Sequence, residues 1–202
     1  MSMSIRSGAE MSTTAPTEER ILDAARSCFS RFGLHKTVME DIAREADLSR
    51  GSLYRYFPDK ESLYRAVSAR ETKYFIDDIA RRTARARSLE TKIERVLVAA
   101  MEFLYDNPIN AAMAATDPEA FAATLSTNGR DLLALAVEAI IPMVHEAIEA
   151  GEVRADVDPP RAAEWIVRMA LSLISTPSVT FDRDDPVELR RFLGDFLLPG
   201  LT

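Results

Sequence analysis

Apolar residues recur along this chain at the spacing of helices. In residues 17–33 they lie three or four positions apart, as in an amphipathic helix whose apolar face meets a core. Comparable stripes continue to about residue 198, and no strand-like alternation extends beyond a few positions. The pattern predicts an all-α protein of about nine helices. The apolar face of the first helix holds Ile21, Leu22, Ala25, Cys28, Phe29 and Phe32, and Gly33 is its expected stop.

Two short helices joined by a tight turn are predicted next. Thr37 and Glu40 fit a capping box, in which both side chains bond to backbone N–H groups at a helix start. Ser49 suits the N-cap of the following helix, which runs to about Tyr56. Asp47 in the turn tolerates the left-handed conformation. This is the layout of a helix-turn-helix, in which one helix crosses the DNA backbone and the next enters the major groove.

A helix in the major groove needs a close backbone approach, side chains that read base edges, and phosphate contacts that fix its register. The second helix of the pair meets all three needs. Gly51 allows the close approach, and Arg50 can reach O6 and N7 of guanine. We further expect base or phosphate contacts from Ser52, Tyr54 and Arg55, and phosphate contacts from Thr37, Tyr56 and Lys60.

The alternative is that the aromatic residues of this segment are ordinary core residues of a helical bundle. Helical spacing partly separates the core residues of this segment from those that would face DNA. Leu53, Phe57 and Leu63 are placed to pack against the first helix, whereas Arg50 and Arg55 cannot be buried without leaving uncompensated charge. We therefore expect one buried and one DNA-facing side on this helix.

Charge is unevenly distributed. The 202 residues carry a formal net charge of -7. Residues 1–70 hold 11 Lys and Arg against 10 Asp and Glu, which leaves 14 against 22 in residues 71–202. The acidity thus lies outside the helix-turn-helix, where it would limit non-specific DNA binding. The single cysteine, Cys28, excludes an internal disulfide and is expected to be a small core residue.

The sequence predicts three regions along the chain. Residues 1–16 are rich in small polar residues and are expected to form a disordered arm. Residues 17–66 form the DNA-binding domain, and residues 67–202 form a larger helical domain in which Pro142 should kink a long helix. No apolar run reaches the roughly 20 residues of a membrane helix, so a cytoplasmic protein that does not bind membranes is expected.

A basic run, made up of Arg81, Arg82, Arg85 and Arg87, lies near the expected end of the fourth helix. It invites a nucleic-acid interpretation. The alternative, which we favour, is a solvated helix end whose cations suit the negative end of the helix dipole.

At these motifs the sequence resembles the TetR/AcrR family of bacterial transcriptional regulators. The resemblance covers residues 17–67 and rests on TVMEDIA at 37–43 and LSRGSLYRYFPDKESL at 48–63, preceded by a helix that ends in Phe-Gly. Two positions depart from the family pattern. Asp47 stands where Gly is usual, and Val38 stands where Ser or Thr is frequent, which shifts the expected cap and phosphate contact to Thr37.

The resemblance implies a homodimeric repressor that binds a palindromic DNA operator and responds to a small, largely apolar effector bound in the C-terminal domain. Its last two helices would pair with those of a second copy. The implied ligand-site residues are Phe75, Ile79, Met101, Phe103, Tyr105, Met113, Phe121, Leu125, Met143 and His145. The implied dimer residues are Trp165, Ile166, Met169, Leu173, Phe192 and Phe196.

Two other hypotheses remain beside a ligand-responsive regulator. The C-terminal domain could serve as a protein-interaction module without a small-molecule effector. An enzyme is the weaker hypothesis, because His35 and His145 stand 110 positions apart and the sequence has no phosphate-binding glycine loop or metal-spaced cluster. We therefore expect no cofactor, no metal and no catalytic residue.

Overall fold

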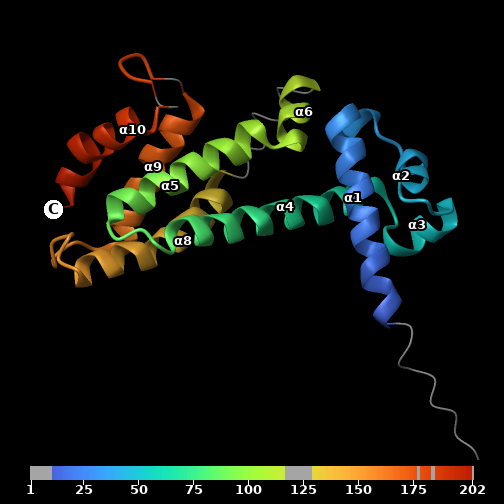
Figure 1. Cartoon of the computed structure of the whole chain (residues 1–202), viewed down its shortest axis with the longest axis horizontal. Helices are drawn as coiled ribbons and strands as arrows, with labels where there is room; N and C mark the ends of the chain where they lie inside the picture. Colours follow the sequence, from blue (N-terminus) through green and yellow to red (C-terminus); the bar gives the residue numbers. More distant parts are fainter. Residues whose placement is uncertain (1–10, 117–128, 177, 183–184, 202) are drawn as a thin grey trace, which may run out of the picture. The chain divides into compact units, whose positions relative to one another are not determined.

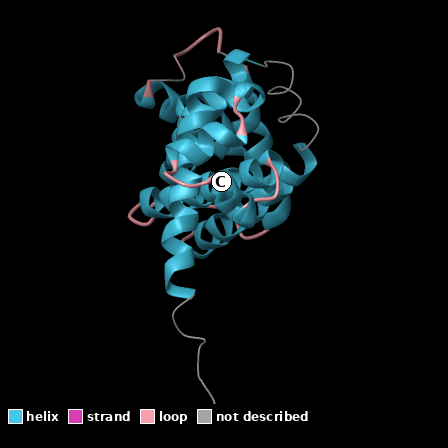
Figure 2. Cartoon of the chain, turned by 90° about the vertical axis from the view of Figure 1, so that its right-hand side faces the viewer, coloured by secondary structure: helices cyan, strands magenta, loops and turns pink. Residues whose placement is uncertain are grey.

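The computed structural model describes residues 11–116, 129–176, 178–182 and 185–201. These ranges contain nine α-helices and no strand, which confirms the predicted all-α fold (Figure 2). No helix in them is long and apolar enough to cross a membrane. The helices are α1 (Met11–Lys36), α2 (Met39–Glu45), α3 (Arg50–Tyr56), α4 (Lys60–Thr83), α5 (Leu89–Met101), α6 (Pro108–Thr116), α8 (Gly129–Glu149), α9 (Pro159–Ser175) and α10 (Pro186–Phe192).

The chain forms two compact units. The first, here called the head, comprises residues 1–73 and 108–118, and the second, the body, comprises residues 74–107 and 119–202. The head thus extends beyond the boundary predicted at residue 66, and it includes α6 from much later in the chain. The reason is packing: α6 lies against α1, and its Ile109 belongs to the core of the head.

The head is built around α1, with α2 and α3 beside it (Figure 1). Leu53, Phe57 and Leu63 are buried in its core, as predicted. Cys28 is 1% exposed, which confirms its place in the core, and burial raises the pKa of its thiol. Other buried members are Ile21, Leu22, Ala24, Ala25, Phe29, Met39, Ile42, Ala43, Ala46 and Val67.

The first helix is longer than predicted. It begins at Met11 rather than Thr17, so six residues of the expected arm are helical, and residues 1–10 lie outside the described ranges. Gly33, the expected stop, is where the backbone leaves helical geometry, with φ 75° and ψ 165°. One further turn follows before the chain reaches α2.

The turn between α2 and α3 follows from its sequence. Asp47 has φ 52°, as predicted for a residue in the left-handed region. Its N–H donates to the carbonyl of Arg44, and the N–H of Leu48 donates to that of Ala43. These two bonds form a Schellman motif, which satisfies carbonyls at the end of α2. Ser49 then caps α3, with its hydroxyl accepting from the N–H of Ser52 at 3.1 Å.

The body packs α5, α8, α9 and α10 around one apolar core. Pro142 lies inside α8, as expected. A bidentate ion pair joins α10 to α5: Arg190 donates from Nε and Nη2 to the buried carboxylate of Glu94 at 2.8 and 2.9 Å. Residues with under 3% exposure in this core include Leu89, Ile93, Leu97, Val144, Ala163, Ile166, Leu189, Leu193 and Leu197.

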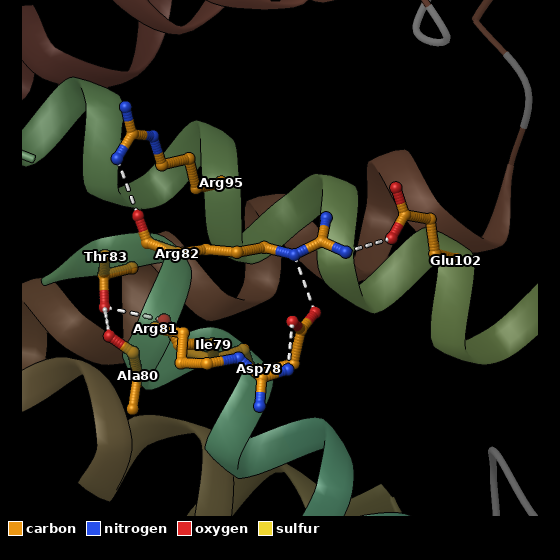
Figure 3. A network of polar contacts seen from close by, with 8 residues as sticks. All are labelled: Asp78, Ile79, Ala80, Arg81, Arg82, Thr83, Arg95 and Glu102. Atoms are coloured by element: carbon orange, nitrogen blue, oxygen red, sulfur yellow. Dashed lines mark hydrogen bonds and ion pairs between the residues drawn. The ribbon is translucent and has the colours of Figure 1, made fainter. Parts of the chain in front are cut away.

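Part of the basic run at the end of α4 is used within the body (Figure 3). Arg82 pairs with Asp78 and Glu102, each at 2.6 Å, and its carbonyl accepts from Arg95 at 2.6 Å. The hydrogen bond to Glu102 raises the pKa of Arg82. Arg81 pairs with Asp78 on its own helix at 2.9 Å. These contacts favour the helix-end interpretation over a nucleic-acid site.

Candidate nucleic-acid interface

Helix α3 presents one buried and one exposed side. Leu53 is completely buried and anchors the helix on the head core. On the opposite side Arg50, Gly51, Tyr54 and Arg55 are exposed. This division is what a major-groove helix requires, because its reading side chains must be free of the core while the helix itself is held rigidly.

Arg50 and Tyr54 form a contact on that exposed side. The Arg50 guanidinium carbon lies 5.4 Å from the centroid of the Tyr54 ring, within cation–π distance. Arg50 Nη1 also lies 2.8 Å from Oε1 of Glu40 on α2. An open depression of about 530 Å³ adjoins the ion pair of Arg50 and Glu40. It is lined by Glu40, Ala43, Arg44, Asp47, Leu48, Ser49 and Arg50.

Ser52 and Arg55 complete the residues that we expect to meet bases or phosphates. The Ser52 hydroxyl lies 2.9 Å from that of Ser49, beside the cap of α3. Arg55 is exposed and forms no ion pair within the described part of the chain. Its guanidinium is therefore available for a phosphate or a base edge without breaking an existing contact.

Thr37 lies where its side chain serves the fold. It is fully buried, and its single hydroxyl proton is shared between the carbonyls of Gly33 at 2.7 Å and Cys28 at 3.2 Å. The predicted capping box is therefore wrong: Val38 is the N-cap of α2 and makes no side-chain bond there. The Thr37 hydroxyl is directed to the end of α1, and the Glu40 carboxylate to Arg50.

Lys60 also has partners inside the head. Its ammonium donates to the carbonyls of Leu34, His35 and Thr37 at 2.8, 3.2 and 3.0 Å. Carbonyls at the end of a helix lack partners within it, and a cation there also suits the dipole. Tyr56 is half-buried against the head core. Thus Thr37 and Lys60, two of the three residues predicted for phosphate contacts, have structural roles, and their DNA contacts stay predictions.

Replacing Thr37 by valine separates these roles. We expect Thr37→Val to lower the free energy of unfolding by about 1 kcal/mol, because the buried hydrogen bond of its hydroxyl is lost while the shape is retained. If the buried hydroxyl is used only within the head, the salt dependence of DNA binding should not change. Urea unfolding and binding at several salt concentrations measure both quantities. A decrease in the salt slope by about one unit would instead show that Thr37 contacts a phosphate.

The sequence interpretation missed the pairing of Glu40 with Arg50. A glutamate three residues after a threonine matches a capping box, so spacing along the chain assigned Glu40 to its own helix. Only the packing of α2 against α3 brings its carboxylate to Arg50. An acidic residue shortly before the predicted recognition helix was the available signal.

Ligand-site candidates fall in both units. Within the body, the rings of Phe75 and Phe103 stack with centroids 4.5 Å apart, and the Tyr105 hydroxyl donates to the carbonyl of Ile174 at 2.5 Å. Ile79, Met101 and Met143 are half-buried there, and His145 is exposed. Met113 belongs to the head, where its sulfur accepts from the Tyr64 hydroxyl at 3.8 Å. Phe121 and Leu125 lie outside the described residues.

The dimer candidates divide by exposure. Trp165 is 46% exposed and Phe196 is 68% exposed. Met169, Leu173 and Phe192 are half-buried, and Phe192 packs between Phe181 and Phe196 with ring centroids 4.6 and 5.3 Å away. Ile166 is 1% exposed and belongs to the core of the body. Exposed apolar side chains therefore lie on α9 and beyond α10. Ile166 is not one of them, because it packs inside the core beneath that surface.

Comparison with known proteins places this chain in a family. Residues 21–67 match the family model described as "Bacterial regulatory proteins, tetR family". The HTH-type transcriptional regulator Rv1255c of Mycobacterium tuberculosis (strain ATCC 25618 / H37Rv), which is named as uncharacterized, is 30% identical over 91% of this chain and 85% of its own length.

Two solved structures have the same fold. A transcriptional regulator from Cytophaga hutchinsonii ATCC 33406 aligns with a TM-score of 0.67 at 21% identity, over 91% of this chain and 97% of its own. FadR from Bacillus subtilis, solved in complex with stearoyl-CoA, aligns with a TM-score of 0.62 at 19% identity, over 91% and 99%. With the head geometry and the relative that matches over most of its length, these matches show that this chain belongs to the tetR family of bacterial regulatory proteins and is a DNA-binding transcriptional regulator.

Proposed function

We propose that this protein is a cytoplasmic repressor that binds a palindromic operator as a homodimer and is released by a small, largely apolar molecule. The observation that carries the DNA part is the exposed side of α3, where Arg50, Tyr54 and Arg55 project opposite the buried Leu53. Such an arrangement leaves the side chains that read bases accessible and fixes the helix that bears them.

The exposed apolar residues of the body support the dimer. Trp165 on α9 and Phe196 beyond α10 expose large rings that a second copy would cover. A twofold dimer places two α3 helices on half-sites about one helical turn of DNA apart, or a multiple of that, so its operator is palindromic.

The ligand part rests on the composition of the body and on one structure of the same fold. Phe75, Ile79, Met101, Phe103 and Met143 are apolar, half-buried residues of the body. Flexible methionines and stacked aromatic rings adapt readily to an apolar molecule. FadR from Bacillus subtilis was solved with stearoyl-CoA, a molecule with a long apolar chain.

Selection of bound sequences from random DNA tests the proposal. We expect the full-length protein to enrich one palindromic sequence, and light scattering of the complex to show two chains for each operator. Candidate apolar ligands that raise the melting temperature should then lower operator affinity. Failure to enrich any sequence would refute specific DNA binding. Enrichment without any ligand effect would favour a body that serves as a protein-interaction module.

Gly51 provides a test of close approach to DNA. An added Cβ at Gly51 meets nothing within 4 Å, and the residue is in the first turn of α3. We expect Gly51→Ala to stabilise the free protein by about 0.5–1 kcal/mol, since alanine favours the helix. Operator affinity should nevertheless fall, because the methyl group would occupy the space between helix and DNA. Calorimetric unfolding and operator titration measure the two effects. Unchanged affinity would exclude a close approach at this residue.

A further inference from the structure

Arg50 is restrained from two directions in the absence of DNA. Its Nη1 lies 2.8 Å from Oε1 of Glu40, which belongs to the preceding helix, and its guanidinium lies over the ring of Tyr54, one turn further along α3. The side chains of Arg50 and Glu40 are 66% and 46% exposed, so the pair is at the surface where DNA would arrive. An exposed arginine without such contacts samples many rotamers and loses that freedom on binding.

The geometry leaves the reading capacity of Arg50 intact. A guanidinium has five N–H donors in a fixed fork, and the contact to Glu40 occupies only the Nη1 side. The remaining N–H groups can still form the two parallel bonds that recognise O6 and N7 of guanine. The Tyr54 ring meanwhile restricts the plane of the fork.

A carboxylate at this place also has a disadvantage. It repels the phosphates of an approaching duplex, so by its charge alone Glu40 weakens binding to every sequence. Arg50 is the first residue of α3, and no acidic residue lies in the first turn of that helix to offset the unfavourable cation at its positive end. Glu40 supplies the missing negative charge from α2.

We propose that Glu40 is a positioning residue for DNA recognition: it holds Arg50 in the orientation in which Arg50 reads one guanine of the operator. Glu40 itself does not read that base. The inference rests on the proposed function, and it assigns specificity at a single base pair to a residue outside the recognition helix.

Competition binding with the full-length protein tests this inference. The probes are the selected operator and three variants that carry the other base pairs at the position where Arg50→Ala relaxes the preference. Loss of a bidentate contact should lower discrimination there by about 5- to 150-fold in Arg50→Ala. Glu40→Ala should lower it at the same position alone by up to about 5-fold, the upper end of the range for an exposed ion pair. Glu40→Gln, which keeps an acceptor oxygen, should lie between Glu40→Ala and the wild type.

Asp41 provides the matched control. It lies next to Glu40 and pairs with Arg44 rather than with Arg50. Asp41→Ala removes the same charge from the same helix, so it should raise affinity for all probes alike and keep their ranking. The double variant Glu40→Ala, Arg50→Ala should discriminate no less than Arg50→Ala, since Glu40 acts only through Arg50. An unchanged melting temperature of Glu40→Ala would show that the effect is not a loss of folded protein.

Three results would overturn the inference. Glu40→Ala could raise affinity for all probes as Asp41→Ala does, with discrimination unchanged, and Glu40 would then act only as a surface charge. Arg50→Ala could relax no operator position, in which case there is no base reading to support. In both cases the wild type still selects an operator, and the proposed function stands. A wild type that selects no operator refutes the proposed function and the inference together.

Discussion

Replacing Leu53 by alanine should lower the free energy of unfolding of the head by about 2–5 kcal/mol, the range observed for removing most of a buried leucine side chain. Leu53 is completely buried, and it is the only buried residue of α3, a helix that the structure describes in full. The loss includes both the transfer of apolar groups and the cavity left between α3 and the rest of the head. DNA binding should fall with the fraction of folded head.

Urea unfolding measures this loss of stability, and two spectroscopic signals distinguish unfolding of the head from unfolding of the body. Circular dichroism follows all helices, whereas Trp165, the single tryptophan, lies in the body and reports on it by fluorescence. Leu53→Met is the matched control, because a swap of similar volume usually costs less than about 1.5 kcal/mol. A loss below about 1 kcal/mol in Leu53→Ala would contradict the anchoring role of Leu53.

Replacing Gly33 by alanine should destabilise the head by at least about 1–3 kcal/mol, the usual cost of a strained backbone conformation. Gly33 has φ 75° and ψ 165°, a combination adopted almost only by glycine. An added Cβ would also lie 2.9 Å from Oγ1 of Thr116 on α6. Both effects act at the place where the chain leaves α1.

Thr116→Ala distinguishes the two contributions to this cost. In the Gly33→Ala background it removes the close contact but leaves the backbone strain, so it should restore only part of the lost stability. Calorimetry of the two single variants and the double variant measures the coupling. If Gly33→Ala unfolded at the same temperature as the wild type, the backbone of Gly33 could not be confined to this region.

Much of the fold could be predicted because local patterns specify it. Helical spacing identified the all-α class and the burial of Leu53, Phe57 and Leu63. Turn chemistry likewise identified Asp47 as left-handed and Ser49 as the cap of α3, since both depend on neighbouring backbone groups. The exposed side of α3 followed from the same spacing.

The contacts that spacing along the chain did not reveal are those between residues of different helices or loops. Lys60 reaches carbonyls at the end of α1, about 25 residues earlier, and Thr37 directs its hydroxyl to carbonyls of Gly33 and Cys28 rather than to the start of α2. Ile166 lies in the core of the body. Its burial was hard to predict, because a broad apolar stripe on α9 does not indicate which of its edges faces the core. Each of these side chains could have made the same kind of contact with several partners, and the spacing of residues along the chain does not indicate which partner it meets.

The sequence by itself thus determined the helices, the turn between α2 and α3, and which side of α3 is free to meet DNA, because each depends on interactions within a few residues. The tertiary structure alone decided that α6 joins the head, that Lys60 and Thr37 complete the end of α1, and that Glu40 meets Arg50. Those choices depend on which surfaces pack together, and contacts between distant residues form only when the chain has folded.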